Sequence, residues 1–135
     1  MTTQQLIAHF LERGNALQTF WGFYIAISGA IVTAVGKGVP KGPPFFSTVL
    51  SVAFCAFAFV NCSGMLDIIK QRHFFFRELE KIAADRSPSI AESEARLAAD
   101  FTALRTLSTP KQVLWFHLIA DVLVLTAVWI LTPRS

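Results

Sequence analysis

Three observations predict an all-α membrane protein with three transmembrane helices. Hydrophobic side chains make up 53% of the 135 residues and charged ones only 16%, which is too apolar for an ordinary soluble domain of this size. Three apolar runs are each long enough to cross a bilayer core of about 30 Å as a helix. A charged, helix-forming stretch separates the second run from the third. We therefore expect an N-terminal amphipathic helix, three spans, and a cytoplasmic helical hairpin between the second and third spans.

The first segment, 2–15, is predicted to be an amphipathic helix that lies at the membrane surface or leads into the first span. Thr2 and Gln5 have the spacing of a capping box, and an apolar stripe follows them. Gly14 favours a bend before the first span, 16–36, because glycine weakens a helix interior. A signal peptide is the competing interpretation, but the uncharged run is longer than the apolar core of a signal peptide.

Small side chains recur on one face of the first span and on one face of the second span, 44–69. The Gly- and Pro-rich connection between these spans is short, so they should form an antiparallel hairpin. In lipid, small residues let helix backbones approach closely, and we predict that both faces pack against neighbouring helices. Ala and Gly are also simply common in membrane helices. The predicted packing residues are Gly22, Ala26, Ala30, Ala34, Ser51, Cys55, Ala58 and Cys62.

The segment 70–107 is predicted to be a water-exposed helical hairpin. Leu79 and Ile82 on its first arm should face an apolar stripe on its second arm, so that both stripes are buried. The members of the second stripe are Ile90, Leu97, Phe101 and Leu104. This face could instead lie on lipid headgroups or bind another protein. The third span is predicted at 111–132.

The distribution of Lys and Arg predicts the orientation. Nine of the twelve fall on the side shared by the N-terminus and the hairpin, and three fall on the other side. Cytoplasmic loops carry the excess of positive charge, so we expect the N-terminus in the cytoplasm and the C-terminus outside, in a bacterial inner membrane. Lys70, Arg72 and Arg77 stand among aromatic residues and are predicted to contact lipid headgroups. Topology and anionic lipid explain the basic residues better than nucleic acid does.

Asp121 is the most informative polar residue because it stands near the middle of the third span. A carboxylate at that depth is costly, so it should face the protein interior and be paired or protonated. His117 lies one turn before it on the same face, and Asn61 on the second span lies at a comparable depth. We predict an internal polar cluster of Asp121, His117 and Asn61. A structural role in helix register is favoured, and a proton or ion path is the alternative.

Motifs for catalysis are missing from the sequence: there is no nucleotide loop, no HExxH motif and no Ser-His-Asp pattern with supporting context. The His and Cys residues lack ligand spacing within one helix, so we expect no metal and no cofactor. The favoured hypothesis is a non-enzymatic accessory, scaffold or effector subunit that acts through helix packing and the cytoplasmic hairpin. It would form a homo-oligomer or join a larger membrane complex.

Two alternatives belong to other functional classes. The first is an oligomeric ion or proton channel that uses His117 and Asp121. The second is a cofactor-binding membrane anchor, because three spans with the N-terminus inside are similar in outline to the haem and quinone anchor subunits of respiratory complexes. That similarity concerns architecture alone, since none of their motifs occurs here.

Overall fold

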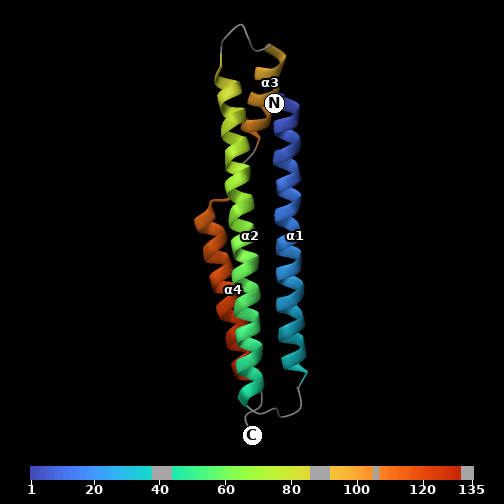
Figure 1. Ribbon diagram of the computed structural model, residues 1–135, viewed down its shortest axis with the longest axis vertical. Coiled ribbons are helices and arrows are strands. Elements are labelled where there is room, and N and C mark those ends of the chain that lie inside the picture. Colours follow the sequence, from blue (N-terminus) through green and yellow to red (C-terminus); the bar gives the residue numbers. More distant parts are fainter. Residues whose placement is uncertain (38–43, 86–91, 105–106, 132–135) are drawn as a thin grey trace.

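The computed structural model describes residues 1–37, 44–85, 92–104 and 107–131, which form four α-helices (Figure 1). The helices are α1 (Thr3–Gly36), α2 (Pro44–Ala84), α3 (Glu92–Ala103) and α4 (Pro110–Leu131). α1 and α2 are long rods that lie side by side, and α4 lies along the half of α2 that is distant from the N-terminus. α3 packs at the opposite end, beside the start of α1. α1, α2 and α4 are long and apolar enough to cross a membrane.

α1 is one continuous helix, whereas the sequence predicted a bend at Gly14. Its start has the predicted capping box: Thr2 N donates to Gln5 Oε1 at 2.9 Å, and Gln5 N donates to Thr2 Oγ1 at 3.3 Å. Gly14 does not break the helix because buried Phe10 and Leu17 pack on either side of it. One glycine costs a helix about 1 kcal/mol, and burying two large side chains offsets more than that. The segment 2–15 therefore continues directly into the predicted first span.

α2 continues without interruption for 41 residues. The predicted second span and the first arm of the predicted hairpin are thus a single rod. Phe54, Met65 and Leu79 are buried at successive levels along it. The ring of Phe20 on α1 lies directly against Gly64, because a Cβ atom at this position would lie 2.5 Å from Cε1 of Phe20.

α3 forms the second arm of the hairpin, and it packs against α1 as well as α2. Leu6 of α1, Leu79 of α2 and Ala98 of α3 form the buried core of this layer. Thr3 Oγ1 also donates to Glu94 Oε2 at 3.4 Å. The layer has three helices rather than the two expected, because α1 extends past the apolar part of the molecule beside α2. We call this layer, made of α3 and the adjoining ends of α1 and α2, the polar-end layer.

The face of α3 that is buried differs from the predicted apolar stripe. Leu97 is 41% exposed and Leu104 is 85% exposed, whereas Ala98 is fully buried and Phe101 is half-buried. The small side chain of Ala98 lets α3 pack closely against Leu6 of α1 and Leu79 of α2. Ile90 lies outside the described residues.

α4 begins at Pro110, one residue before the predicted start of the third span, and its last described residue is Leu131. Thr109 N donates to Gln112 Oε1 at 2.9 Å, and Gln112 N donates to Thr109 Oγ1 at 3.2 Å. This is a second capping box, and the ring of Pro110 suits the first helical position. The helix packs against both α1 and α2.

Candidate functional site

Asp121, the polar residue on which the sequence prediction centred, is bound by Tyr24 of α1. The Tyr24 hydroxyl donates to Asp121 Oδ1 at 2.6 Å, a distance typical of a hydroxyl bound to a carboxylate. Tyr24 is only 3% exposed, and Asp121 is half-buried. This bond joins α1 to α4 within the apolar part of the molecule.

His117 lies one turn before Asp121 and is 2% exposed. Its Nε2 lies 3.3 Å from the carbonyl oxygen of Ala58, and a carbonyl only accepts, so Nε2 donates this bond. Nδ1 of a neutral ring is then an acceptor, and it is buried without a partner among the described residues. The ring centroids of His117 and Tyr24 are 4.2 Å apart. Tyr24 therefore touches both polar residues that the sequence singled out on α4.

Asn61 is buried but does not join this group. Within the described ranges, no hydrogen bond links Asn61 to Asp121 or His117, and its Nδ2 is buried without a partner. The bond from His117 to Ala58 fixes the register of α4 along α2 and leaves Asn61 one turn farther along α2. Tyr24 takes the place that the sequence prediction gave to Asn61.

A groove of about 340 Å³ lies between α2 and α4 and reaches Asp121 and His117. Its walls are mainly apolar and include Phe54, Phe59 and Leu118. The carboxyl group of Asp121 can accept a hydrogen bond or hold a proton at this position. Within the described part of the chain, no group of three or more His, Cys, Asp or Glu side chains could hold a metal ion.

The predicted packing face of α1 is not buried by the described residues of this chain. Its four small residues are exposed, and a Cβ atom at Gly22 would have no atom within 4 Å. α1 packs instead through larger side chains on another face, among them Leu17 and Phe20. The predicted packing of this face against a neighbouring helix is thus not seen among the described residues, and contact with a helix of another chain stays untested. The members of this face are Gly22, Ala26, Ala30 and Ala34.

The residues of the predicted packing face of α2 differ in their burial. Ala58 is buried, and its carbonyl accepts the bond from His117. Ser51 and Cys62 are half-buried, and Cys55 is exposed. Ala58 is thus the member of this face that is both buried and hydrogen-bonded to α4.

Lys70 and Arg77 lie on an open face of α2, but Arg72 does not. Residues 70 and 77 fall on nearly the same helix face, whereas about 200° separates 70 from 72. The guanidinium carbon of Arg72 lies 4.5 Å from the ring centroid of Phe10 on α1, a cation–π contact. Lys70 Nζ lies 2.9 Å from Asp67 Oδ1. Arg72 therefore supports the contact between α1 and α2, and headgroup contact stays a prediction for Lys70 and Arg77.

The sequence prediction missed Tyr24, although its position along the first apolar run indicates a depth similar to that of Asp121. Tyr24 stands eleven residues after Arg13, and Asp121 stands ten residues after Lys111. Helices that enter an apolar layer from the same side advance by the same distance per residue. Residues at similar numbers of positions from the entry point therefore lie at similar depths. Tyr24 is also the only tyrosine of the chain. Its hydroxyl was thus the available donor at the level of the carboxylate.

Comparisons of the chain with protein families, with curated proteins and with solved structures find no match. Its function therefore has to be inferred from the residues and contacts described above.

Proposed function

We propose that this chain is a small non-enzymatic integral membrane protein that acts as a scaffold or accessory subunit. The observation that carries the proposal is the continuity of α1 and α2 from the apolar part of the molecule into the polar-end layer. Because neither helix is broken between the two parts, α1 and α2 hold α3 at a fixed position relative to the apolar part. Such a molecule can hold a partner protein at a set distance from the bilayer.

The surface of the three apolar helices supports insertion into lipid. Large apolar side chains are exposed on each of them, for example Phe23 at 62%, Phe59 at 74% and Leu123 at 65%. A soluble monomer rarely exposes so much contiguous apolar surface. With the N-terminus in the cytoplasm, the polar-end layer would also be cytoplasmic, on the side that carries nine of the twelve Lys and Arg residues.

The polar groups inside the apolar part favour a structural role. Asp121 and His117 both make hydrogen bonds within one chain, to Tyr24 and to the Ala58 carbonyl. Bonds of this kind set the rotation and register of α4 against α1 and α2. A pore on the axis of an oligomer would need such groups on an outer face of the protomer, whereas His117 is 2% exposed.

The surface we propose for the partner is the outer face of α3. Leu97 and Leu104, the residue that follows α3, are exposed and belong to neither core cluster of the described residues. Leu97 also borders a groove of about 310 Å³ between α3 and the start of α1, which Thr3 and Glu94 help to line. Apolar side chains beside a polar-lined groove form a surface suited to a helix or loop of another protein.

Chemical cross-linking in native membranes, followed by purification in mild detergent, tests this proposal. The Leu97→Ser, Leu104→Ser double variant should lose a partner that the wild type retains. A Leu114→Ser, Leu118→Ser variant is the matched control, because these leucines are also exposed but lie on α4. Recovery of the wild type as a solitary monomer after cross-linking would contradict the proposal, and so would retention of the partner by the α3 variant.

Proton conduction is a second candidate, favoured by the groove that reaches half-buried Asp121. A proteoliposome assay with an imposed pH gradient would test it. Proton flux above that of empty liposomes, lost in a folded Asp121→Asn variant, would replace the purely structural role of this residue. The cofactor-anchor alternative predicts a visible absorption band in the purified protein, and the scaffold proposal predicts none.

A further inference from the structure

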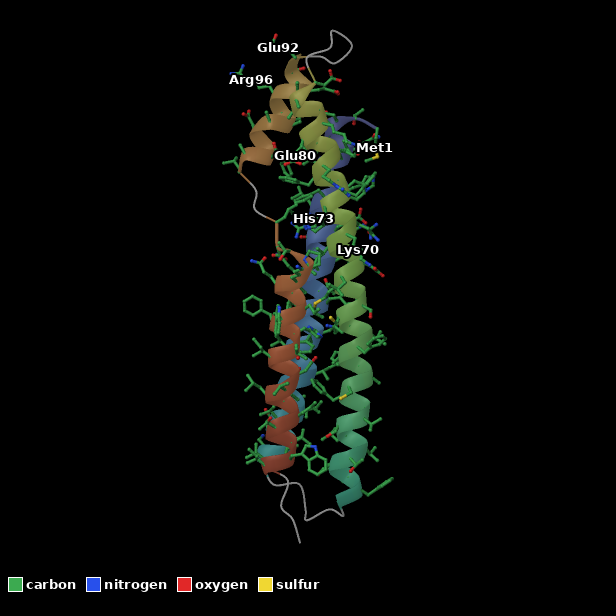
Figure 2. All side chains as sticks on the ribbon, turned by 90° about the vertical axis from the view of Figure 1, so that its left-hand side faces the viewer. Met1, Lys70, His73, Glu80, Glu92 and Arg96 are labelled. Atoms are coloured by element: carbon green, nitrogen blue, oxygen red, sulfur yellow. The ribbon has the colours of Figure 1, made fainter. Side chains whose placement is uncertain are left out.

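A pocket with basic walls lies where α4 begins beside α2. Its volume is about 330 Å³, and it is lined by Lys70, His73 and Arg77 of α2 and by Pro110 of α4. The three α2 residues follow one another at spacings of three and four, so they share one face of the helix. Figure 2 shows Lys70 and His73 on α2 near the level at which α4 begins.

A tertiary hydrogen bond builds the wall of this pocket. His73 Nε2 lies 3.2 Å from the carbonyl oxygen of Ser108, which can only accept, so His73 donates. This bond ties the residues that precede α4 to α2 and places Pro110 beside the basic side chains. His73 is therefore a positioning residue of the pocket.

Both full cations of the pocket are available to an anion. Arg77 has no ion-pair partner in the described ranges. Lys70 pairs with Asp67, but their side chains are 70% and 67% exposed, and an ion pair in water contributes little. The flexible stem of Lys70 can turn toward a stronger acceptor at small cost. A guanidinium binds a phosphate group through two parallel hydrogen bonds, which makes phosphate the best match for Arg77.

The depth of the pocket indicates that this phosphate belongs to a lipid. The exposed apolar surface of α4 starts one turn past Pro110, with Leu114 at 50%, Trp115 at 63% and Phe116 at 67% exposed. Aromatic residues are enriched at the level where the hydrocarbon core meets the headgroups. The pocket thus lies at the edge of the apolar surface, where the phosphate of a phospholipid would be and its acyl chains could follow α4.

We propose that Lys70 and Arg77, with His73 holding the wall, bind the phosphate group of an anionic phospholipid at the junction of α2 and α4. This inference and the proposed function have one assumption in common, which is that the chain is inserted in a membrane. It does not depend on any protein partner, so loss of partner binding would leave this inference standing.

Native mass spectrometry of the full chain in detergent tests the proposal by counting bound lipids. Phosphatidylglycerol should remain bound to the wild type, and phosphatidylcholine at the same concentration should not. The Lys70→Gln, Arg77→Gln variant should bind phosphatidylglycerol about tenfold more weakly. Lys81→Gln, Arg96→Gln is the matched control, because it removes the same residue types from the polar-end layer, where Figure 2 shows Arg96 far from Lys70. It should bind like the wild type.

Two further arms complete the test. The charge-conserving Lys70→Arg, Arg77→Lys variant should keep most of the binding, which separates loss of charge from a folding defect. Inorganic phosphate at millimolar concentration should not displace the lipid. Equal binding by the test and control variants would overturn the proposal, and full displacement by inorganic phosphate would overturn the assignment to lipid.

Discussion

The Tyr24 hydroxyl donates a hydrogen bond of 2.6 Å to Asp121, and it links two residues that are 97 positions apart in the chain. The bond crosses from the first helix to the last. Rotation of α4 by one residue, about 100°, would carry Asp121 away from Tyr24 and toward the apolar exterior. The pair therefore selects a single rotation of α4 among several that would bury similar apolar area.

Tyr24→Phe should destabilise the fold by about 1–2 kcal/mol. The change removes one hydroxyl, leaves the ring, and deprives Asp121 Oδ1 of its donor in apolar surroundings. Unfolding in mixed detergent and dodecyl sulfate micelles, followed by circular dichroism, would measure it. Adding Asp121→Asn to Tyr24→Phe should cost less than the sum of the two single changes, because the two residues share one interaction.

Ser51→Ala provides the control for the tyrosine variant. Ser51 lies on α2, and its Oγ is buried without a partner among the described residues. Removal of this hydroxyl should change stability by less than about 0.5 kcal/mol. An equal loss in both variants would show that the Tyr24 to Asp121 bond has no special role.

Gly64→Ala should destabilise the contact between α1 and α2 by roughly 1–2 kcal/mol. The new Cβ atom would meet Cε1 of Phe20 at 2.5 Å, so the ring or the helix must shift. Gly22→Ala is the matched control and should be neutral or stabilising by up to about 1 kcal/mol, since no atom lies within 4 Å of its Cβ position and alanine favours a helix. The same unfolding assay applies. Recovery of stability in a Gly64→Ala, Phe20→Leu double variant would identify the ring as the cause, and a neutral Gly64→Ala would refute this prediction.

Ala98→Leu should release α3 from the polar-end layer. Ala98 is fully buried against Leu6 and Leu79, and overpacking a closely packed position costs about 1–3 kcal/mol. Hydrogen exchange followed by mass spectrometry should show faster exchange in α3 and unchanged exchange in α4. Ala99→Leu, at the exposed neighbouring position, should leave exchange in α3 as in the wild type. Equal exchange in the two variants would mean that Ala98 does not hold α3.

Reporter fusions should place the two ends of the chain on opposite sides of the membrane. The start of α1 and the end of α4 lie at opposite ends of the molecule (Figure 1), as three spans require. The positive-inside rule predicts that the N-terminus is in the cytoplasm. Alkaline phosphatase fused after residue 135 should be active, and the same enzyme fused before residue 1 should be inactive. A C-terminus reachable only from the cytoplasm would exclude the three-span arrangement.

Much of the fold can be predicted from local patterns because those patterns have local causes. Three apolar runs of sufficient length predict three long apolar helices, and the structure has them at α1, α2 and α4. The spacing of Thr2 and Gln5 predicts a capping box, which depends on residues within one turn. The cost of a bare carboxylate in apolar surroundings predicts that Asp121 turns inward, whatever its partner.

Tertiary packing decided the remaining features: the partner of Asp121, the buried face of α3, the orientation of Arg72 and the unbroken path of α1 through Gly14. Where every face of a helix is apolar, hydrophobic periodicity cannot tell which face meets a neighbour. The outcome depends on the shapes of segments that are distant in the chain, such as the space that Ala98 leaves or the ring that Phe10 offers to Arg72. The sequence by itself therefore determined where the helices run, and only their contacts decided how each one is rotated.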